Sequence, residues 1–216
     1  MVVGQNKIAA LKARYRQQKS AIADRLAHFK EVGKAGDRDI FGELCFCILT
    51  PQSKALVCDG IVQKLKSSGL LFDGNDGQIR PHVRYARFYR NKTGYIVAAR
   101  DRFRSGGKIR IKEKIAGMPP IAAREWLVNN VKGIGYKEAS HFLRNIGLGE
   151  DLAILDVHIL RNLKELGVIP GIPRSLTRKR YLEIEEKLRG FARRCRIPAG
   201  HLDLLFWSMA TGRIFK

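Results

Sequence analysis

The chain has 216 residues, of which 41 are Lys or Arg and 20 are Asp or Glu, so its formal net charge at pH 7 is +21. This length suits one domain, or one domain of two lobes, and disfavours two independent enzymatic modules. Because no segment has the roughly 18 to 20 consecutive apolar residues of a membrane span, the positive charge indicates nucleic acid rather than a membrane as the polyanionic partner.

The predicted elements are helical throughout, because apolar residues recur at helical spacing and no sustained apolar–polar alternation occurs. The first helix carries an apolar stripe and ends at glycines 33–36; the stripe consists of Ile8, Leu11, Tyr15, Ile22, Leu26 and Phe29. Further helices are predicted from Asp37 to about Leu49, from a cap at Ser53 to about Ser67, from Pro81 to about Phe103, from Pro119-Pro120 to Asn130, from Lys137 to Ile146, from an Asp156 cap to Gly167, from a Ser175 cap to about Arg194, and from Ala199 to about Thr211. Residues 74–77 and 171–173 are expected to form loops, and the fold class is all-α.

Two glycines mark a helical hairpin in the run Val131-Lys132-Gly133-Ile134-Gly135-Tyr136-Lys137-Glu138-Ala139. Glycine lets a backbone approach phosphate closely, and the free amides and dipole of the following helix then face that anion. Tight packing of two helices would also explain a pair of glycines. An apolar frame and the charge of +21 favour DNA binding; the frame consists of Leu127, Val131, Ile134, Ala139 and Phe142.

Lys137 lies in the first turn of the second hairpin helix, where the dipole and the basic chain favour an uncharged, nucleophilic amine. Asp156 follows 19 residues later. A helix of about ten residues rises roughly 15 Å, and an extended return of about six residues after glycines 147–149 covers up to roughly 20 Å. Asp156 can therefore return beside Lys137, and a carboxylate that caps a helix is held ionised there. A lysine that only contacts phosphate remains the alternative, and His158 is expected to pack or support rather than act as a base.

These residues resemble the helix-hairpin-helix DNA glycosylase superfamily, in which a hairpin lysine and an aspartate in a context such as Leu155-Asp156-Val157-His158 mark members that also cut the strand. The closer resemblance is to the archaeal-type 8-oxoguanine DNA glycosylase/lyase family. It extends over essentially the whole chain, from residues 47–53 through residues 133–156 to the terminus at residues 204–216.

The resemblance implies a two-lobed fold with the active site in the cleft between the lobes. Residues 1–216 would form a single domain, with a central lobe at about 37–155 and a second lobe built from 1–36 and 156–216. Lys137 would attack C1′ of a flipped nucleotide and form a Schiff base that permits β-elimination. Asp156 would stabilise the sugar cation.

The resemblance also implies substrate contacts. Trp207, Phe88 and the terminal Lys216 would contact the damaged base, Gln52 would fill the gap in the duplex, and Gly133 and Gly135 would bind its backbone. From the sequence alone, Gln52 could equally be a polar loop residue. Trp207 could be a core aromatic beside Leu204, Leu205 and Met209.

The expected partner is double-stranded DNA that contains 8-oxoguanine or abasic sites. No metal or other cofactor is expected, because the four cysteines lack metal-ligand spacing and read as reduced, partly buried residues. We expect a monomer without membrane association that is intracellular, cytoplasmic or nucleoid-associated. Two other functions remain open: a non-catalytic helix-hairpin-helix DNA-binding protein, and a glycosylase for a different damaged base.

A basic, aromatic-rich stripe lies at residues 80–114, with twelve Lys or Arg and two acidic residues. A solvated helix face would explain such a run. The interleaved aromatic residues fit tracking of a nucleic-acid backbone and stacking on bases better.

Overall fold

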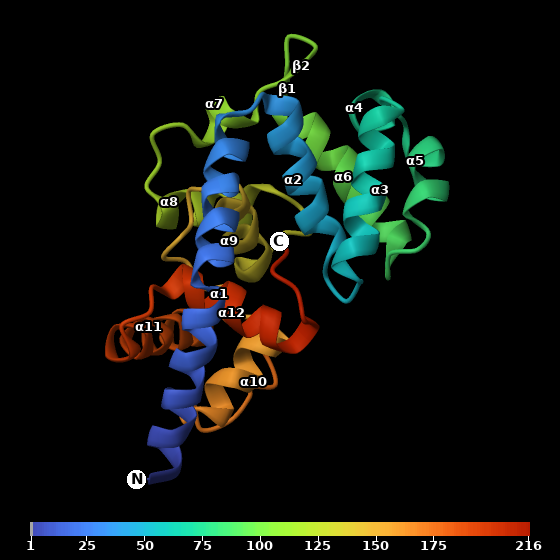
Figure 1. Ribbon diagram of the computed structural model, residues 1–216. Helices are drawn as coiled ribbons and strands as arrows, with labels where there is room; N and C mark the ends of the chain where they lie inside the picture. The colour runs from blue at the N-terminus through green and yellow to red at the C-terminus, as the bar shows by residue number, and fades with distance from the viewer. Residues whose placement is uncertain (1) are drawn as a thin grey trace.

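The structure is a computed structural model that describes the backbone of residues 2–216 and the side chains of residues 6–216 (Figure 1). The helices are α1 (Val2–Lys34), α2 (Asp37–Leu49), α3 (Ala55–Ser67), α4 (Leu70–Asp73), α5 (Asp76–Val83), α6 (Tyr89–Phe103), α7 (Ile111–Ile115), α8 (Pro120–Asn130), α9 (Tyr136–Asn145), α10 (Val157–Glu165), α11 (Arg178–Cys195) and α12 (Ala199–Thr211). Two short antiparallel strands, β1 (Arg104–Ser105) and β2 (Lys108–Ile109), form a hairpin in which Arg104 pairs with Ile109. The prediction of an all-α fold is confirmed.

One predicted helix is wrong between residues 84 and 88. Pro81 does not open a helix; it lies inside α5, which begins at Asp76, so residues 76 and 77 are helical rather than part of a loop. Asn75 and Gln78 cap the start of α5 reciprocally, the side chain of each accepting a hydrogen bond from the backbone N–H of the other. The chain then turns, and α6 begins after Phe88, whose φ of 59° is left-handed.

Two predicted caps are also wrong. Ser53 does not cap α3, which begins after Lys54, because the Ser53 hydroxyl is hydrogen-bonded elsewhere. Helix α11 begins after Thr177 rather than Ser175, and the Thr177 hydroxyl accepts the hydrogen bond from the Arg180 N–H. At α11 a neighbouring threonine thus takes the capping role that the sequence assigned to Ser175, whereas the N-cap of α3, Lys54, makes no capping hydrogen bond through its side chain.

Buried apolar side chains form two clusters. One comprises residues between Ile40 and Leu152, from α2 to the end of the hairpin. The other combines Leu11–Phe29 of α1 with residues between Ala153 and Phe206. The predicted stripe of α1 is confirmed from Leu11 to Phe29, and Ile8 is half-buried.

Helix α1 runs alongside both groups of helices in Figure 1, and the C-terminal tail turns back from α12 toward α2 and α9. The first and last helices of the chain are in contact, since α1 packs against α12. Helix α1 also packs against α9. Within residues 2–216, none of the helices combines the length and the apolar character that crossing a membrane requires.

Candidate active site

A helical hairpin joins α8 to α9 at the two glycines, as the sequence predicted. Gly133 has a φ of +85°, and a Cβ there would lie 2.3 Å from Cδ2 of the Tyr95 ring. Ile134 is buried between the helices, as are the other residues of the predicted apolar frame. Gly133 is exposed, so the tip of the hairpin presents backbone rather than side chain to a ligand.

Lys137 is the second residue of α9, immediately after this turn. Gly135 is the N-cap, and its N–H donates to Oε2 of Glu138 at 3.2 Å. The Lys137 side chain is 22% exposed, and its Nζ lies 3.7 Å from Oε1 of Glu138. The Lys137 side chain is therefore partly open to solvent and lies beside Glu138.

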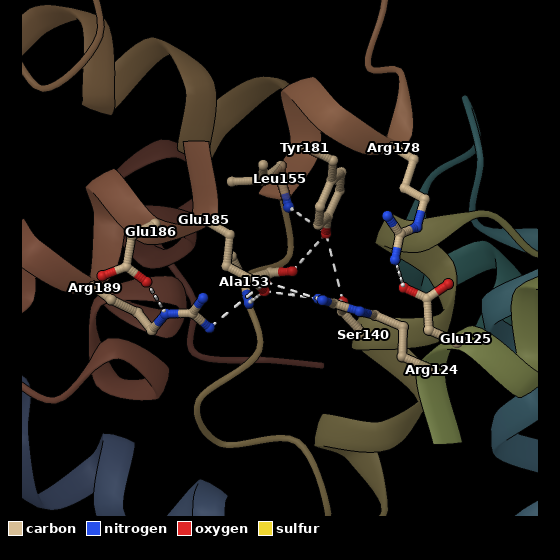
Figure 2. A network of polar contacts seen from close by, with 10 residues as sticks. All are labelled: Arg124, Glu125, Ser140, Ala153, Leu155, Arg178, Tyr181, Glu185, Glu186 and Arg189. Carbon is tan, nitrogen blue, oxygen red and sulfur yellow. Dashed lines mark hydrogen bonds and ion pairs between the residues drawn. The ribbon is translucent and has the colours of Figure 1, made fainter. Parts of the chain in front are cut away.

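A buried polar network fixes residues 153–155, the return segment that leads from the hairpin to Asp156 (Figure 2). The Arg124 guanidinium donates to both carboxylate oxygens of Glu185, at 2.7 and 3.0 Å, and neither side chain is more than 1% exposed. Glu185 also accepts a hydrogen bond from the Ala153 N–H at 2.8 Å. The network thus ties α8 and α11 to the return segment.

Tyr181, one turn before Glu185 on α11, binds the same segment (Figure 2). Its hydroxyl donates to the Ala153 carbonyl at 2.5 Å and accepts from the Leu155 N–H at 3.3 Å. Residues 153–155 are buried and are tied to α9 as well, because the Tyr181 hydroxyl also contacts Ser140. These bonds determine where Asp156, the next residue, can lie.

Asp156 caps α10, as predicted. Its Oδ1 accepts hydrogen bonds from the backbone N–H groups of His158 and Ile159, each at 2.8 Å. These two bonds fix the direction of the carboxylate. His158 takes part through its backbone.

Asp203 of α12 is a buried acid that sequence reasoning missed. Burial raises the pKa of Asp203 to about 6, and the negative charge of Asp156 adds to this shift. The positive charges of Arg144 and Lys137 oppose it. Helix α12, which carries Asp203, packs against α10, the helix that Asp156 caps. Arg144 pairs with Asp203 at 3.2 Å.

His141 is a second residue that sequence reasoning missed. It lies one turn after Lys137, is 6% exposed, and neither ring nitrogen has a hydrogen-bond partner. Burial lowers its pKa well below the ordinary value, and the charges of Arg144, Lys137 and Lys216 add to this shift. A neutral imidazole therefore lies beside the predicted nucleophile. Only the spacing of four residues from Lys137 could have indicated it.

The C-terminal residues are anchored near this place. Nζ of Lys216 lies 2.8 Å from Oε1 of Glu43 and 2.7 Å from Oδ1 of Asp59. Burial lowers the pKa of Lys216, but the two carboxylates outweigh it and the net shift is upward. A cavity of about 200 Å³ adjoins Lys216 and Phe215 and is lined also by α1.

Trp207 is half-buried rather than part of the core. Its ring lies 6.3 Å from that of Phe215, with the two planes inclined by 32°, and Met209, which would flank it in the alternative reading as a core aromatic, is 45% exposed. Trp207 is therefore partly accessible to solvent beside the C-terminal residues.

Gln52 and Phe88 are both exposed and both left-handed, with φ values of 55° and 59°. Arg87 places its guanidinium over the Phe88 ring, 5.0 Å from the centroid. The basic stripe is not entirely a surface feature, because Lys92 and Arg100 are buried. The other ten Lys and Arg residues of the stripe are exposed.

The four cysteines are free, as predicted, and all four are buried rather than partly buried. Within the residues that the structure describes, no three His, Cys, Asp or Glu side chains are grouped to bind a metal ion.

Comparisons with known proteins agree on one family. Residues 22–197 match the family model described as 8-oxoguanine DNA glycosylase. An 8-oxoguanine DNA glycosylase/AP lyase of Fusobacterium nucleatum is 46% identical over 204 residues, which are 94% of each chain. The crystal structure of the Thermotoga maritima 8-oxoguanine DNA glycosylase superposes with a TM-score of 0.87 at 35% identity and covers 99% of this chain and 100% of that chain.

A second solved structure contains DNA. It is the 8-oxoguanine glycosylase/lyase of Methanocaldococcus jannaschii in complex with a 15mer that contains 8-oxoguanine. The TM-score is 0.86 at 36% identity, covering 97% of this chain and 99% of that chain.

Proposed function

The chain belongs to the 8-oxoguanine DNA glycosylase family, and from this premise we propose that it excises 8-oxoguanine from DNA and cuts the strand at the resulting abasic site. The observation that carries the proposal is the common environment of Lys137 and Asp156. Each lies at the start of a helix, and the buried segment that leads to Asp156 is bound to α9 through the Tyr181 hydroxyl, which contacts Ser140 within one turn of Lys137. An amine and a carboxylate so arranged suit attack on a sugar whose anomeric carbon becomes cationic.

In the proposed reaction, Nζ of Lys137 forms a bond to C1′ of a flipped nucleotide as the glycosidic bond breaks and the base leaves with the bonding electrons. Loss of the amine proton and opening of the sugar ring give a Schiff base. Removal of a C2′ proton then expels the 3′ phosphate by β-elimination. Asp156, held by two backbone N–H groups, stabilises the positive charge on the sugar and needs no reorganisation.

We propose that the flipped base lies against the rings of the half-buried Trp207 and the exposed Phe88. Stacking of a base on an aromatic ring contributes about 1 to 3 kcal/mol, which offsets part of the cost of removing it from the duplex. Lys216 would contact the base from the C-terminal side, anchored by Glu43 and Asp59.

The partner is DNA, and we propose that the hairpin binds its backbone at Gly133 and Gly135 while Gln52 enters the gap that the flipped nucleotide leaves. The active site would lie between a lobe at about 37–155 and a lobe of 1–36 with 156–216. The buried clusters support this division, since they separate at Leu152 and Ala153. We further propose that the enzyme acts as a monomer, without membrane association, on cellular DNA in the cytoplasm or nucleoid.

Borohydride reduction tests the central step, because it converts a Schiff base into a stable covalent adduct. We expect trapping of wild-type protein on duplexes that contain 8-oxoguanine or an abasic site, and none for Lys137→Gln. Lys132→Gln is the matched control, because Lys132 is an exposed lysine of the same hairpin. Absence of an adduct for wild-type protein on both duplexes would leave a non-catalytic DNA-binding protein. Trapping on a panel of other lesions but not on 8-oxoguanine would identify another glycosylase.

A further inference from the structure

Three residues other than glycine have left-handed backbones within residues 2–216: Gln52, Phe88 and Arg196. Arg196 is the C-cap of α11, a position where left-handed residues are common. The other two are exposed loop residues, where such a backbone is costly for a side chain with a Cβ. Some feature of the surrounding structure must hold them.

Gln52 occupies a turn that would favour glycine. The Ser53 N–H donates to the Thr50 carbonyl at 2.9 Å and closes a four-residue turn with Pro51 second and Gln52 third. Proline at the second position and a positive φ at the third are typical of a type II turn, which usually has glycine third. A long side chain at that position suggests that the side chain itself is required.

Lys92 holds this turn from inside the protein. Lys92 is only 4% exposed. Its Nζ donates to the Leu49 carbonyl at 2.7 Å, the Pro51 carbonyl at 2.6 Å and the Ser53 hydroxyl at 3.1 Å. These bonds use the three hydrogens of an ammonium group, so the bound form is the cation. Burial lowers the pKa of Lys92, with opposing effects of Cys58 and Glu138.

The same serine connects the Gln52 turn to Phe88. The Ser53 hydroxyl oxygen accepts from the Arg87 N–H at 2.9 Å, one residue before Phe88. This one hydrogen bond therefore joins the sequence neighbours of the two left-handed residues, because Ser53 follows Gln52 and Arg87 precedes Phe88. Lys92 itself lies in the first turn of α6, which begins directly after Phe88.

We propose that Lys92 and Ser53 are positioning residues that join the Gln52 turn and the Phe88 turn into one rigid unit. This inference rests on the proposed function, in which Gln52 fills the duplex gap and Phe88 stacks on the flipped base. The unit presents both side chains at a fixed separation, so that occupying the gap and receiving the base occur together. Lys92 acts through the two turns and touches no substrate.

The test uses Lys92→Met, which keeps the length of the side chain and removes its charge and hydrogen bonds, and Ser53→Ala, which removes only the bridging oxygen. We expect both variants to excise 8-oxoguanine from duplex DNA about 10- to 100-fold more slowly in single turnover, the effect of misplacing a contact group by about 1 Å. Cleavage of single-stranded DNA at an abasic site should stay at the wild-type rate, since that substrate has neither a gap nor a base. Arg196→Gly, at the third left-handed residue, should leave both activities unchanged.

A double-mutant cycle separates positioning from general destabilisation. Gln52→Ala should slow duplex excision in the wild-type background and have little further effect beside Lys92→Met, because Gln52 is then already displaced. If Lys92→Met does not fold, the same cycle is run with Ser53→Ala. Additive losses, equal losses on the single-stranded substrate, or wild-type excision by both variants would overturn the inference. Failure of the proposed function is distinct, since wild-type protein itself would then neither excise 8-oxoguanine nor form the Lys137 adduct.

Discussion

The buried pair of Arg124 and Glu185 provides the sharpest prediction of stability. Replacing Glu185 with leucine leaves the Arg124 cation, 0% exposed, with one remaining side-chain partner, the Ser140 hydroxyl at 3.3 Å. Removing one partner of a buried pair costs about 3 to 5 kcal/mol. For a protein of this size, each kcal/mol lowers Tm by about 2 to 4 °C, so we expect a decrease of roughly 6 to 20 °C.

The double variant Arg124→Met/Glu185→Leu should be more stable than Glu185→Leu alone, because no buried charge remains unpaired. It should still lose about 1 to 3 kcal/mol, because the Ala153 N–H loses its acceptor. Glu183→Gln is the control, since Glu183 forms an exposed pair with Arg180 at 3.2 Å and such pairs contribute about 0 to 1 kcal/mol. Urea unfolding followed by circular dichroism measures all three. A Glu185→Leu variant within about 1 kcal/mol of wild type would refute the reasoning.

Four further predictions concern the hairpin, the buried acid, the C-terminus and the charge. Gly133→Ala should lower stability by about 1 to 3 kcal/mol and weaken DNA binding, because its Cβ would meet the Tyr95 ring at 2.3 Å, whereas Gly171→Ala, with no atom within 4 Å, should change neither. Folding raises the pKa of Asp203 from 3.8 to about 6, so the native state binds the proton of this carboxyl more tightly than the unfolded state does. The free energy of unfolding of the wild type relative to Asp203→Asn, measured by urea titration, should therefore fall from about pH 4 to about pH 6 and then stay level. A rise over this range would contradict the assignment. Deleting Lys216 should impair 8-oxoguanine excision more than cleavage at a preformed abasic site, and equal losses would argue against contact with the base. If about six phosphates are neutralised, the log–log slope of DNA affinity against salt, measured by fluorescence anisotropy, should approach about −5, and a flat dependence would exclude phosphate binding as the main term.

Local sequence signals determined most of the helices. The start of α2 at Asp37, the proline before α8, the Asp156 cap of α10 and the limits of α12 all coincide with the structure. Each depends on residues close together in the chain. The errors arose where two local signals competed, as when Pro81 was given more weight than the Asn75–Gln78 cap of α5.

The sequence likewise identified some residues of the candidate site and not others. The sequence by itself singled out Lys137 and Asp156, because a glycine hairpin and a helix cap are short-range patterns and the intervening length permits a return. It did not identify Asp203, distant in sequence from both, or separate Lys92 from the surrounding basic residues. Only the packing of α12 against α10 and of α6 against α2 decided that these charges are buried. Burial depends on contacts between segments far apart in the chain, and it is burial that converts an ordinary charged residue into one with a fixed position and a perturbed pKa.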